Sequence, residues 1–235
     1  ELETFGFALF YDKGDLFFNL SHCKEPIYEG DIVYDSNDKF HGTTWVNGIV
    51  PYIFDPFLSA NISGTVKKAM ERIESVSSVK FVERTNEQDY IKIVSKEGSY
   101  SCVGRQCKGE QELSIAAGDA NSIGIAMHEL MHVLGVFHEH SRPDRDNFLT
   151  VTNFPDDINF VKIPDNKAVC HGAYDLESIM HYEPGVYNNQ KIELKPGIMS
   201  KRIGQRERLS QGDIDGLNKL YPPRSERSMW GFWKR

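Results

Sequence analysis

Long hydrophobic runs are missing from this 235-residue sequence. No uninterrupted apolar stretch approaches the ~18 residues that a membrane-spanning helix requires, so no transmembrane segment is expected. Basic charge is also in deficit, with 27 Lys and Arg against 34 Asp and Glu and no basic cluster, which argues against a nucleic-acid partner. Neither an initiator Met nor the charged start and apolar core of a signal peptide is present, so any such peptide is expected to have been removed already.

Cysteine is scarce as well, with only Cys23, Cys102, Cys107 and Cys170 in the chain. Four cysteines are too few for a disulfide scaffold, and a chain of this length buries a sufficient core without one. Cys102 and Cys107 are close enough in sequence for a local bridge, but spacing alone does not choose among the three possible full pairings. Internal repeats and low-complexity linkers are also absent.

Short hydrophobic patterns predict a mixture of strands and helices. They predict strands over residues 50–54, 79–82, 90–94 and, more briefly, 112–117. Helical spacing predicts helices over 64–76 and 122–134, and Ser210 fits the N-cap of a last helix that ends before Pro222. Residues 29–42 are polar and punctuated by glycine, which indicates a loop, and the half after Gly135 is irregular. This order predicts an α+β fold with two lobes around one cleft.

Residues 128–138, HELMHVLGVFH, have the spacing of metal ligands. His128 and His132 lie one turn apart on the predicted helix, so both imidazoles can reach one Zn²⁺ ion at about 2.0–2.1 Å. Gly135 can adopt a positive φ and turn the chain off the helix, which lets His138 return as the third ligand. Three nitrogen ligands leave one position open, as in catalytic zinc sites, and Glu129 is placed beside the metal as a general base. A histidine pair packed in a core would need neither the glycine nor the third histidine, so the pattern favours zinc.

The longer segment 128–146, HELMHVLGVFHEHSRPDRD, resembles the zinc signature of the astacin family of metzincin metalloendopeptidases. Residues 178–182, SIMHY, resemble the Met-turn of that family, and 45–52, WVNGIVPY, resemble an early astacin motif. Residues 209–221 resemble the C-terminal helix, so the resemblance runs from about Trp45 to Tyr221. It implies a two-lobed metzincin (zincin) fold with a cleft between the lobes. The N-terminal lobe would hold a mixed twisted sheet and two helices, one of them the zinc-binding helix, and the irregular C-terminal lobe one long helix.

The resemblance also implies roles for residues around the zinc. Met180 would be the Met-turn residue that packs below the metal. Tyr182 would be a further, labile ligand that swings away and hydrogen-bonds the developing oxyanion. The alternative for both is ordinary core packing. In this family an extended substrate pairs with the upper edge strand of the sheet. The segment that resembles this strand here is Ser99, Tyr100, Ser101, Cys102 and Val103.

The cysteine pattern departs from the family. Astacins usually carry two disulfides, and their positions near Val79 and Ser99 hold other residue types here, with no cysteine after Cys170. A Cys102–Cys107 bridge would instead constrain the rim of the cleft. The departure indicates a divergent branch of the family, and a bacterial branch is one candidate.

The resemblance places the start of the mature enzyme near Ser36. Residues 1–35 are therefore expected to be an inhibitory pro-segment, followed by a catalytic domain over 36–235 whose lobes meet after residue 135. In mature astacins the new N-terminus is buried and pairs with the Glu that follows the third zinc histidine. That residue is Glu139 here, and its alternative is a solvated surface carboxylate. An activating protease is implied, and Lys39-Phe40 is a trypsin-type site near the boundary.

Two residues of the pro-segment are candidates for the ligand that blocks zinc in the latent form. Cys23, in HCKEP, resembles the cysteine switch of matrix metalloproteinases, and a thiolate is a strong zinc ligand. Asp31, in YEGD, resembles the aspartate switch of animal astacins. The short chain between Asp31 and Ser36 favours Cys23. Neither blocks zinc if Cys23 instead pairs with Cys170 or is an inert thiol and Asp31 does not reach the metal.

Together these observations predict a secreted zinc endopeptidase with one catalytic Zn²⁺ ion that hydrolyses extended polypeptides. Its own pro-segment and an activating protease are the other expected partners. One alternative is a protease-like binding or adhesion module, whose mark would be a broken ligand set or a lost Glu129, and neither occurs. Another is a zinc hydrolase of non-peptide amides, against which the implied substrate strand argues. The aromatic tail at 230–233 has no assigned role.

Overall fold

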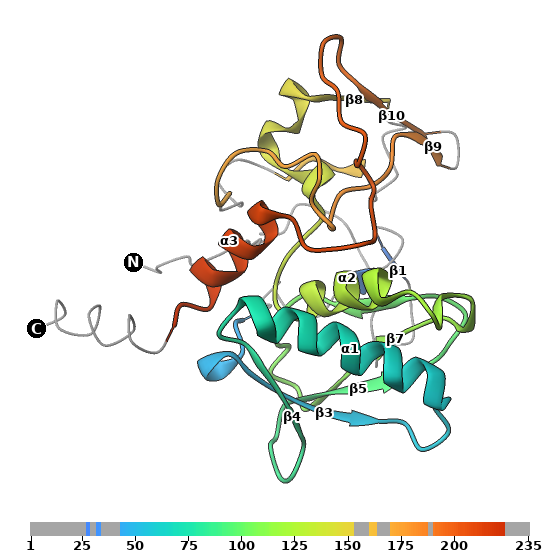
Figure 1. Ribbon diagram of the computed structural model, residues 1–235, viewed down its shortest axis with the longest axis vertical. Coiled ribbons are helices and arrows are strands. Elements are labelled where there is room, and N and C mark those ends of the chain that lie inside the picture. The colour runs from blue at the N-terminus through green and yellow to red at the C-terminus, as the bar shows by residue number, and fades with distance from the viewer. Residues whose placement is uncertain are drawn as a thin grey trace, which may run out of the picture.

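The computed structural model describes residues 27–28, 32–33, 43–152, 160–163, 170–187 and 190–223. Within these ranges the chain forms two parts (Figure 1). The first contains a sheet and the helices α1 and α2, and the second contains the chain after α2, with three further strands and α3. Cys23 and Asp31 lie outside the described residues, as does most of the expected pro-segment. No helix in the described ranges is both long and apolar enough to cross a membrane.

The first part is built on one mixed sheet. Its strands are β1 (Ile27–Tyr28), β2 (Ile32–Val33), β3 (Ile49–Phe54), β4 (Lys80–Glu83), β5 (Tyr90–Val94), β6 (Tyr100–Cys102) and β7 (Glu110–Ser114). They lie in the order β1-β2-β6-β7-β5-β3-β4. Strands β3, β4, β5 and β7 are parallel to one another, whereas β6 is antiparallel to β7. On its other side β6 pairs with β2, in parallel.

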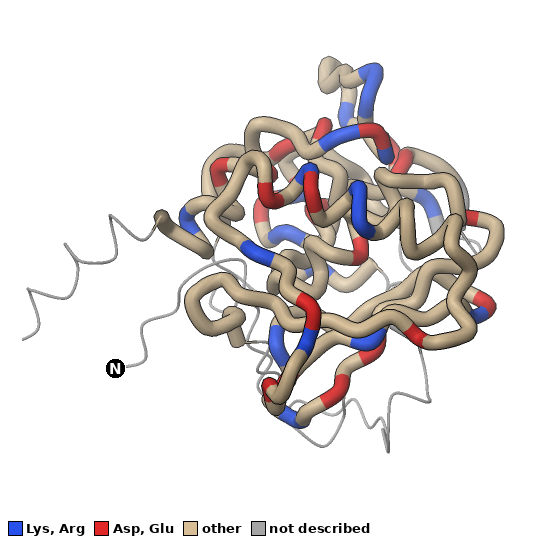
Figure 2. The backbone as a smooth tube through the Cα atoms, turned by 60° about the horizontal axis from the view of Figure 1, so that its bottom comes forward, with Lys and Arg blue, Asp and Glu red and all other residues tan. Residues whose placement is uncertain are grey.

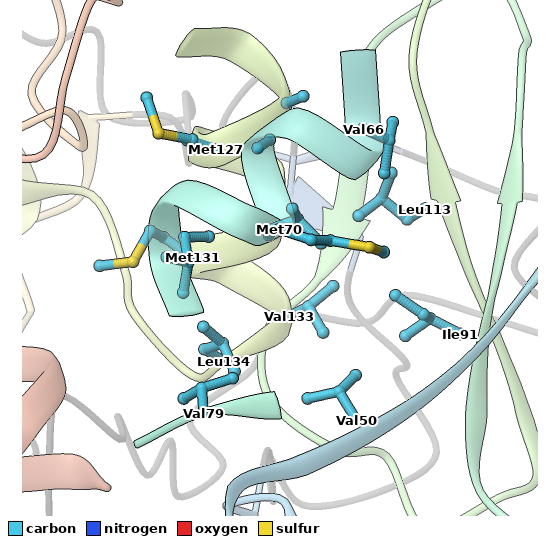
Figure 3. Close-up of a cluster of buried hydrophobic side chains, with 14 of the residues drawn as sticks. Val50, Val66, Met70, Val79, Ile91, Leu113, Met127, Met131, Val133 and Leu134 are labelled. Atoms are coloured by element: carbon cyan, nitrogen blue, oxygen red, sulfur yellow. The ribbon is translucent and has the colours of Figure 1, made fainter. Parts of the chain in front are cut away.

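Two helices lie side by side against this sheet (Figure 1). In α1 (Ala60–Val76) and α2 (Ile123–Val133) the preceding serine hydroxyl accepts a hydrogen bond from a first-turn N–H, which caps the helix. Helix α1 is the crossover between the parallel strands β3 and β4. The buried side chains between helices and sheet are mainly apolar and include Val50, Val66, Met70, Ile91, Leu113 and Val133 (Figure 3). This core fixes α2, which carries the predicted zinc ligands, to the sheet.

The second part is loop-rich with short elements. It contains the 3-10 turns Glu139–Ser141 and Pro143–Asn147, and the strands β8 (Leu149–Thr152), β9 (Gly185–Tyr187) and β10 (Gln190–Leu194). The three strands form an antiparallel sheet in the order β8-β10-β9. A second, smaller core joins them, made of Leu149, Phe160, Tyr174 and Ile192. Helix α3 (Gln211–Leu220) closes the described chain, and two further 3-10 turns lie in the first part, at Val46–Gly48 and Ala117–Asp119.

Most of the predicted elements are confirmed, with three corrections. Helix α1 begins at Ala60 rather than at residue 64, because Ile62 is buried and extends the apolar stripe of the helix by one turn. The other residues of that first turn are mostly polar, so the hydrophobic pattern did not predict that the helix begins there. The predicted loop over 29–42 contains β2, and the half after Gly135 contains a three-stranded sheet that the prediction did not include.

Charged residues of both signs are interspersed along the backbone (Figure 2). Typical ion pairs lie at the surface, such as Lys80–Glu74, where the lysine side chain is 57% exposed. Pairs of this kind contribute at most about 1 kcal/mol to stability. The pair between Arg142 and Glu139 differs, because the two side chains are only 6% and 7% exposed. It lies beside the predicted metal ligands.

Candidate metal centre

Three imidazoles converge at the end of α2. His128 and His132 come from the helix and His138 from the chain that follows, and all three are buried. Their Nε2 atoms form a nearly equilateral triangle with sides of 3.2, 3.2 and 3.3 Å. Nitrogen ligands about 2.0–2.1 Å from a tetrahedral zinc ion are expected to lie about 3.3 Å apart. The triangle therefore has the size that zinc requires.

The tautomers of two of these histidines follow from their other ring nitrogens. Nδ1 of His128 lies 2.8 Å from the carbonyl oxygen of Ile179, and Nδ1 of His132 lies 2.7 Å from that of Val136. A carbonyl only accepts, so both Nδ1 atoms carry the proton and both Nε2 atoms present lone pairs. Lone pairs this close repel unless a cation lies between them. The donor set thus fits a bound zinc ion, with oriented imidazoles of the kind that zinc sites use.

Gly135 turns the chain between the second and third histidines. Its φ is +100°, which glycine adopts readily and other residues rarely do. Its N–H donates to the carbonyl of His132 (2.8 Å), so the helix ends in a tight turn. The predicted role of this glycine, to bring His138 back to the other two ligands, agrees with this geometry.

Glu129 lies on α2 directly after the first histidine and is 1% exposed. Two hydrogen bonds tie its stretch of α2 to strand β6 and to the chain just after that strand. The Ser101 hydroxyl donates to the carbonyl of Glu129 (2.9 Å), and the N–H of Gly104 donates to that of His132 (2.8 Å). The strand that resembles the substrate-binding edge is thus held in register with the metal ligands.

The strand itself is Tyr100–Cys102, within the predicted 99–103. It is not an edge in this structure, because β2 covers the side that β7 leaves open. Ser99, just before it, donates from its hydroxyl to Asp119 (2.6 Å). The described cysteines, Cys102, Cys107 and Cys170, form no disulfide. The bridge between Cys102 and Cys107 that their spacing allowed is therefore absent.

The SIMHY segment passes beneath the three histidines. Met180 is 1% exposed, and its carbonyl accepts from the N–H of Glu139 (3.0 Å), the residue after the third ligand. The neighbouring carbonyl of Ile179 is the one that orients His128. The ring of Tyr182 lies 4.6 Å from that of His138, centroid to centroid. The structure therefore brings Met180 and Tyr182 to the metal site, as the resemblance implies.

Asp213 anchors this segment and was not among the predicted site residues. Its carboxylate accepts from the Ser178 hydroxyl (2.6 Å), from the N–H of Ile179 (2.9 Å) and from the N–H of Ser210 (2.8 Å). Burial raises the pKa of Asp213, and the three donors oppose this shift. The signal in the sequence was the helix cap at Ser210, which predicts the start of α3. It does not predict that Asp213, in the first turn of this helix, contacts Ser178 and Ile179.

A pocket behind the third ligand, called the acidic pocket below, has three acidic residues in its mixed lining, Glu139, Asp175 and Asp213. Glu139 accepts from the N–H of Asp175 (2.7 Å) and pairs with Arg142 (3.2 Å). Arg142 also forms a two-pronged contact with Asp144, at 2.9 Å for each nitrogen. Burial raises the pKa of Glu139 to about 8, and Arg142 opposes this. Because its side chain is only 7% exposed, Glu139 is buried rather than solvated, which excludes the alternative of a surface carboxylate.

Comparison with known proteins agrees with this geometry. The family model described as Astacin, a peptidase family, matches residues 37–222. High choriolytic enzyme 1 from Oryzias latipes is 38% identical over 220 residues, which cover 86% of this chain and 80% of that protein. Astacin-like metalloprotease toxin 1 from Loxosceles intermedia is 34% identical over 218 residues, covering 84% of this chain and 82% of that protein.

Other relatives are much longer than this chain. Human Tolloid-like protein 1 is 36% identical over 191 residues, which cover 75% of this chain but only 19% of that protein. The solved structure of High choriolytic enzyme 1, described as a hatching enzyme zinc-protease, superposes with a TM-score of 0.67 at 37% identity. The match covers 77% of this chain and 94% of that structure. The chain thus belongs to the astacin family of zinc metallopeptidases, and its three buried histidines form a group that could hold the zinc ion.

Proposed function

We propose that the chain is the latent form of a secreted zinc endopeptidase that cleaves extended polypeptides. Residues 1–35 would be the pro-segment, 36–135 the N-terminal lobe and 136–235 the C-terminal lobe of the catalytic domain. The observation that carries the proposal is the triangle of imidazole nitrogens at 3.2–3.3 Å, with a buried glutamate in the same turn of helix. The names of two relatives, a hatching enzyme and a toxin, support secretion.

His128, His132 and His138 would hold the zinc, which when bound lowers the pKa of water and polarises the scissile carbonyl. Glu129 would take the proton from the attacking water and pass it to the leaving amine. Tyr182 would donate a hydrogen bond from its phenol to the oxyanion that develops on the carbonyl. Met180 would support the site from below by packing.

Strand β6 would align the substrate. An extended peptide that adds to this strand gains main-chain hydrogen bonds in any sequence context, which suits a polypeptide substrate. The hydrogen bonds from Ser101 and Gly104 to α2 would fix the position of the strand, and so of a peptide paired with it, relative to the zinc ligands. Because β2 pairs with β6, a substrate would first have to displace the segment before residue 36. This pairing supports latency.

The acidic pocket supports activation by cleavage. The groups that line it include three carboxylates and one guanidinium, and that guanidinium is shared with Asp144. Burial lowers the pKa of His171, which also lines the pocket, so Arg142 is the cation of this lining. An α-ammonium group would supply a second positive charge, which would favour the ionised form of Glu139 against the effect of burial, and three hydrogen-bond donors. A new N-terminus near Ser36, released by cleavage, is the proposed occupant.

Limited proteolysis tests the latent enzyme. The chain should not hydrolyse denatured casein until limited trypsin removes residues up to about 35–40, and a zinc chelator should abolish the activity that appears. N-terminal sequencing of the product identifies the cut, which we expect at Lys39 or nearby. Full activity of the uncut chain would show that the first 35 residues do not inhibit. Inactivity after a correct cut would disprove the peptidase.

Zinc-edge X-ray absorption of the uncut chain tests which pro-segment residue blocks the metal. With Cys23 as ligand, a sulfur shell should lie near ~2.3 Å, and it should vanish after trimming and in Cys23→Ser. Cys170→Ser, which removes a cysteine from the catalytic domain instead, should retain the shell. A spectrum with only nitrogen and oxygen neighbours would exclude Cys23 and leave Asp31 as the candidate. Loss of latency in Asp31→Asn but not in Cys23→Ser would then identify Asp31.

A further inference from the structure

The main-chain carbonyl of Tyr182 is held by a hydrogen bond, whereas its side chain packs against aromatic rings. Its ring is only partly buried and lies against two imidazole rings, with centroid distances of 4.6 Å to His138 and 4.1 Å to His140. Its carbonyl oxygen, in contrast, lies 2.6 Å from Nδ1 of His181. A phenol that serves the metal in one step and the oxyanion in the next needs both properties.

The hydrogen bonds around His181 form a directed chain. Because the carbonyl of Tyr182 only accepts, Nδ1 of His181 must carry the proton, and Nε2 therefore presents a lone pair. The hydroxyl of Tyr174 lies 2.8 Å from this Nε2 and is its donor. Tyr174 and His181 are both buried, at 8% and 0% exposure, so no bulk water replaces the link.

The other contacts of these two residues hold the chain in place. The N–H of His181 donates to the carbonyl of Ser178 (3.1 Å), and its own carbonyl accepts from the Arg206 guanidinium (3.0 Å). The ring of Tyr174 stacks on Phe148, with centroids 4.4 Å apart and an interplanar angle of 12°. The hydroxyl of Tyr174 thus reaches His181 from a ring fixed in the smaller core.

We infer that Tyr174 and His181 are positioning residues that fix the main chain of Tyr182, so that its phenol turns about a stationary pivot between metal and oxyanion. The inference rests on the proposed role of Tyr182. Tyr174 acts through His181, and His181 acts through the peptide carbonyl of Tyr182.

The test is Tyr174→Phe in the full chain, activated with trypsin, because it removes one hydroxyl and keeps the stacked ring. Metal content and circular dichroism should match those of the parent, and KM should stay within about twofold, whereas kcat should fall about tenfold through misplacement of the phenol. Tyr182→Phe should lower kcat about 100-fold, the usual effect of losing an oxyanion donor. In the Tyr182→Phe background, Tyr174→Phe should cause no further loss, since residues that act through one another are not additive.

A spectroscopic readout separates positioning from general stability. Zn²⁺ gives no visible spectrum, so Cu²⁺ replaces it in this experiment. The phenolate of Tyr182, bound to Cu²⁺, should give a visible charge-transfer absorption, and Tyr182→Phe should remove it. Tyr174→Phe should weaken this absorption. The matched control is Tyr221→Phe, which also removes a buried hydroxyl, one that donates to Leu134 (2.9 Å). That variant should melt at a lower temperature but keep both kcat and the absorption.

Each of the following outcomes would overturn the inference. An unchanged absorption in Tyr174→Phe, or an equal loss of kcat in both backgrounds, would make Tyr174 merely structural while leaving the role of Tyr182 intact. An unchanged kcat and spectrum in Tyr182→Phe would overturn the proposed role of Tyr182, and the inference with it. If Tyr174→Phe does not fold, His181→Asn replaces it, because asparagine keeps a donor at the Nδ1 position and loses the link to Tyr174. The same losses are expected, and parental values would refute the inference.

Discussion

Glu129→Ala should retain zinc and lose peptidase activity, with kcat on a peptide substrate lowered about 100- to 10,000-fold, the range that a general base contributes. The candidate metal ligands are three imidazoles, and the Glu129 carboxylate is not one of them. Metal content by atomic absorption should therefore equal that of the parent. KM should change little, because the carboxylate acts on water rather than on the peptide. Glu129→Gln should behave similarly, since the amide keeps the shape but cannot take a proton.

The control for this prediction is Glu71→Gln. Glu71 is an exposed glutamate on α1, so its replacement should leave zinc content and kcat at parental values. Turnover of Glu129→Ala within tenfold of the parent would exclude Glu129 as the base. Loss of the metal together with activity would instead assign a structural role to the carboxylate.

The part of the site that is local in sequence could be predicted, because helix geometry fixes it. Residues four apart on a helix share a face, so the spacing of His128 and His132 determines that they meet. The positive φ of Gly135 follows from the same segment. Tyr182, forty-four residues after His138 in the numbering, came only from the resemblance to a family. No periodicity in the chain places it at the metal.

The remaining residues could not be predicted because their roles depend on contacts between distant segments. Asp213 reads locally as an acidic first-turn residue of α3, a role that it does fill, but its contacts with Ser178 and Ile179 depend on how the lobes pack. Tyr174 depends in the same way on the stacking partner Phe148. Strands β8 and β10 are short and pair across about forty residues, so neither presents a hydrophobic period long enough to predict a sheet.

Gly124→Ala is the second substitution for which a large effect is expected, here on stability. An ideal Cβ at this position would lie 1.6 Å from the carbonyl oxygen of Arg206 and 2.2 Å from its carbonyl carbon. These are backbone atoms, so no rotamer change relieves the clash, and the loop at Arg206 also holds the carbonyl of His181. Either this loop or the first turn of α2 must move. Overpacking of this kind costs roughly 3 kcal/mol or more, which corresponds to a melting temperature lower by about 6–12 °C.

The displacement should also reach the metal site, because Gly124 lies one helical turn before His128 and on the same face of α2. Zinc affinity of Gly124→Ala, measured by competition with a chelator, should therefore fall together with the melting temperature. The matched control is Gly64→Ala in α1, where a Cβ would meet nothing within 4 Å. That variant should be more stable than the parent by about 0.4–1 kcal/mol, because alanine restricts the unfolded chain.

Equal melting temperatures for the two variants would show that the contact between α2 and the Arg206 loop is looser than in this structure. A stability loss in Gly124→Ala with unchanged zinc affinity would show instead that the loop moves and α2 does not, so that the sheet core alone fixes the zinc-binding helix.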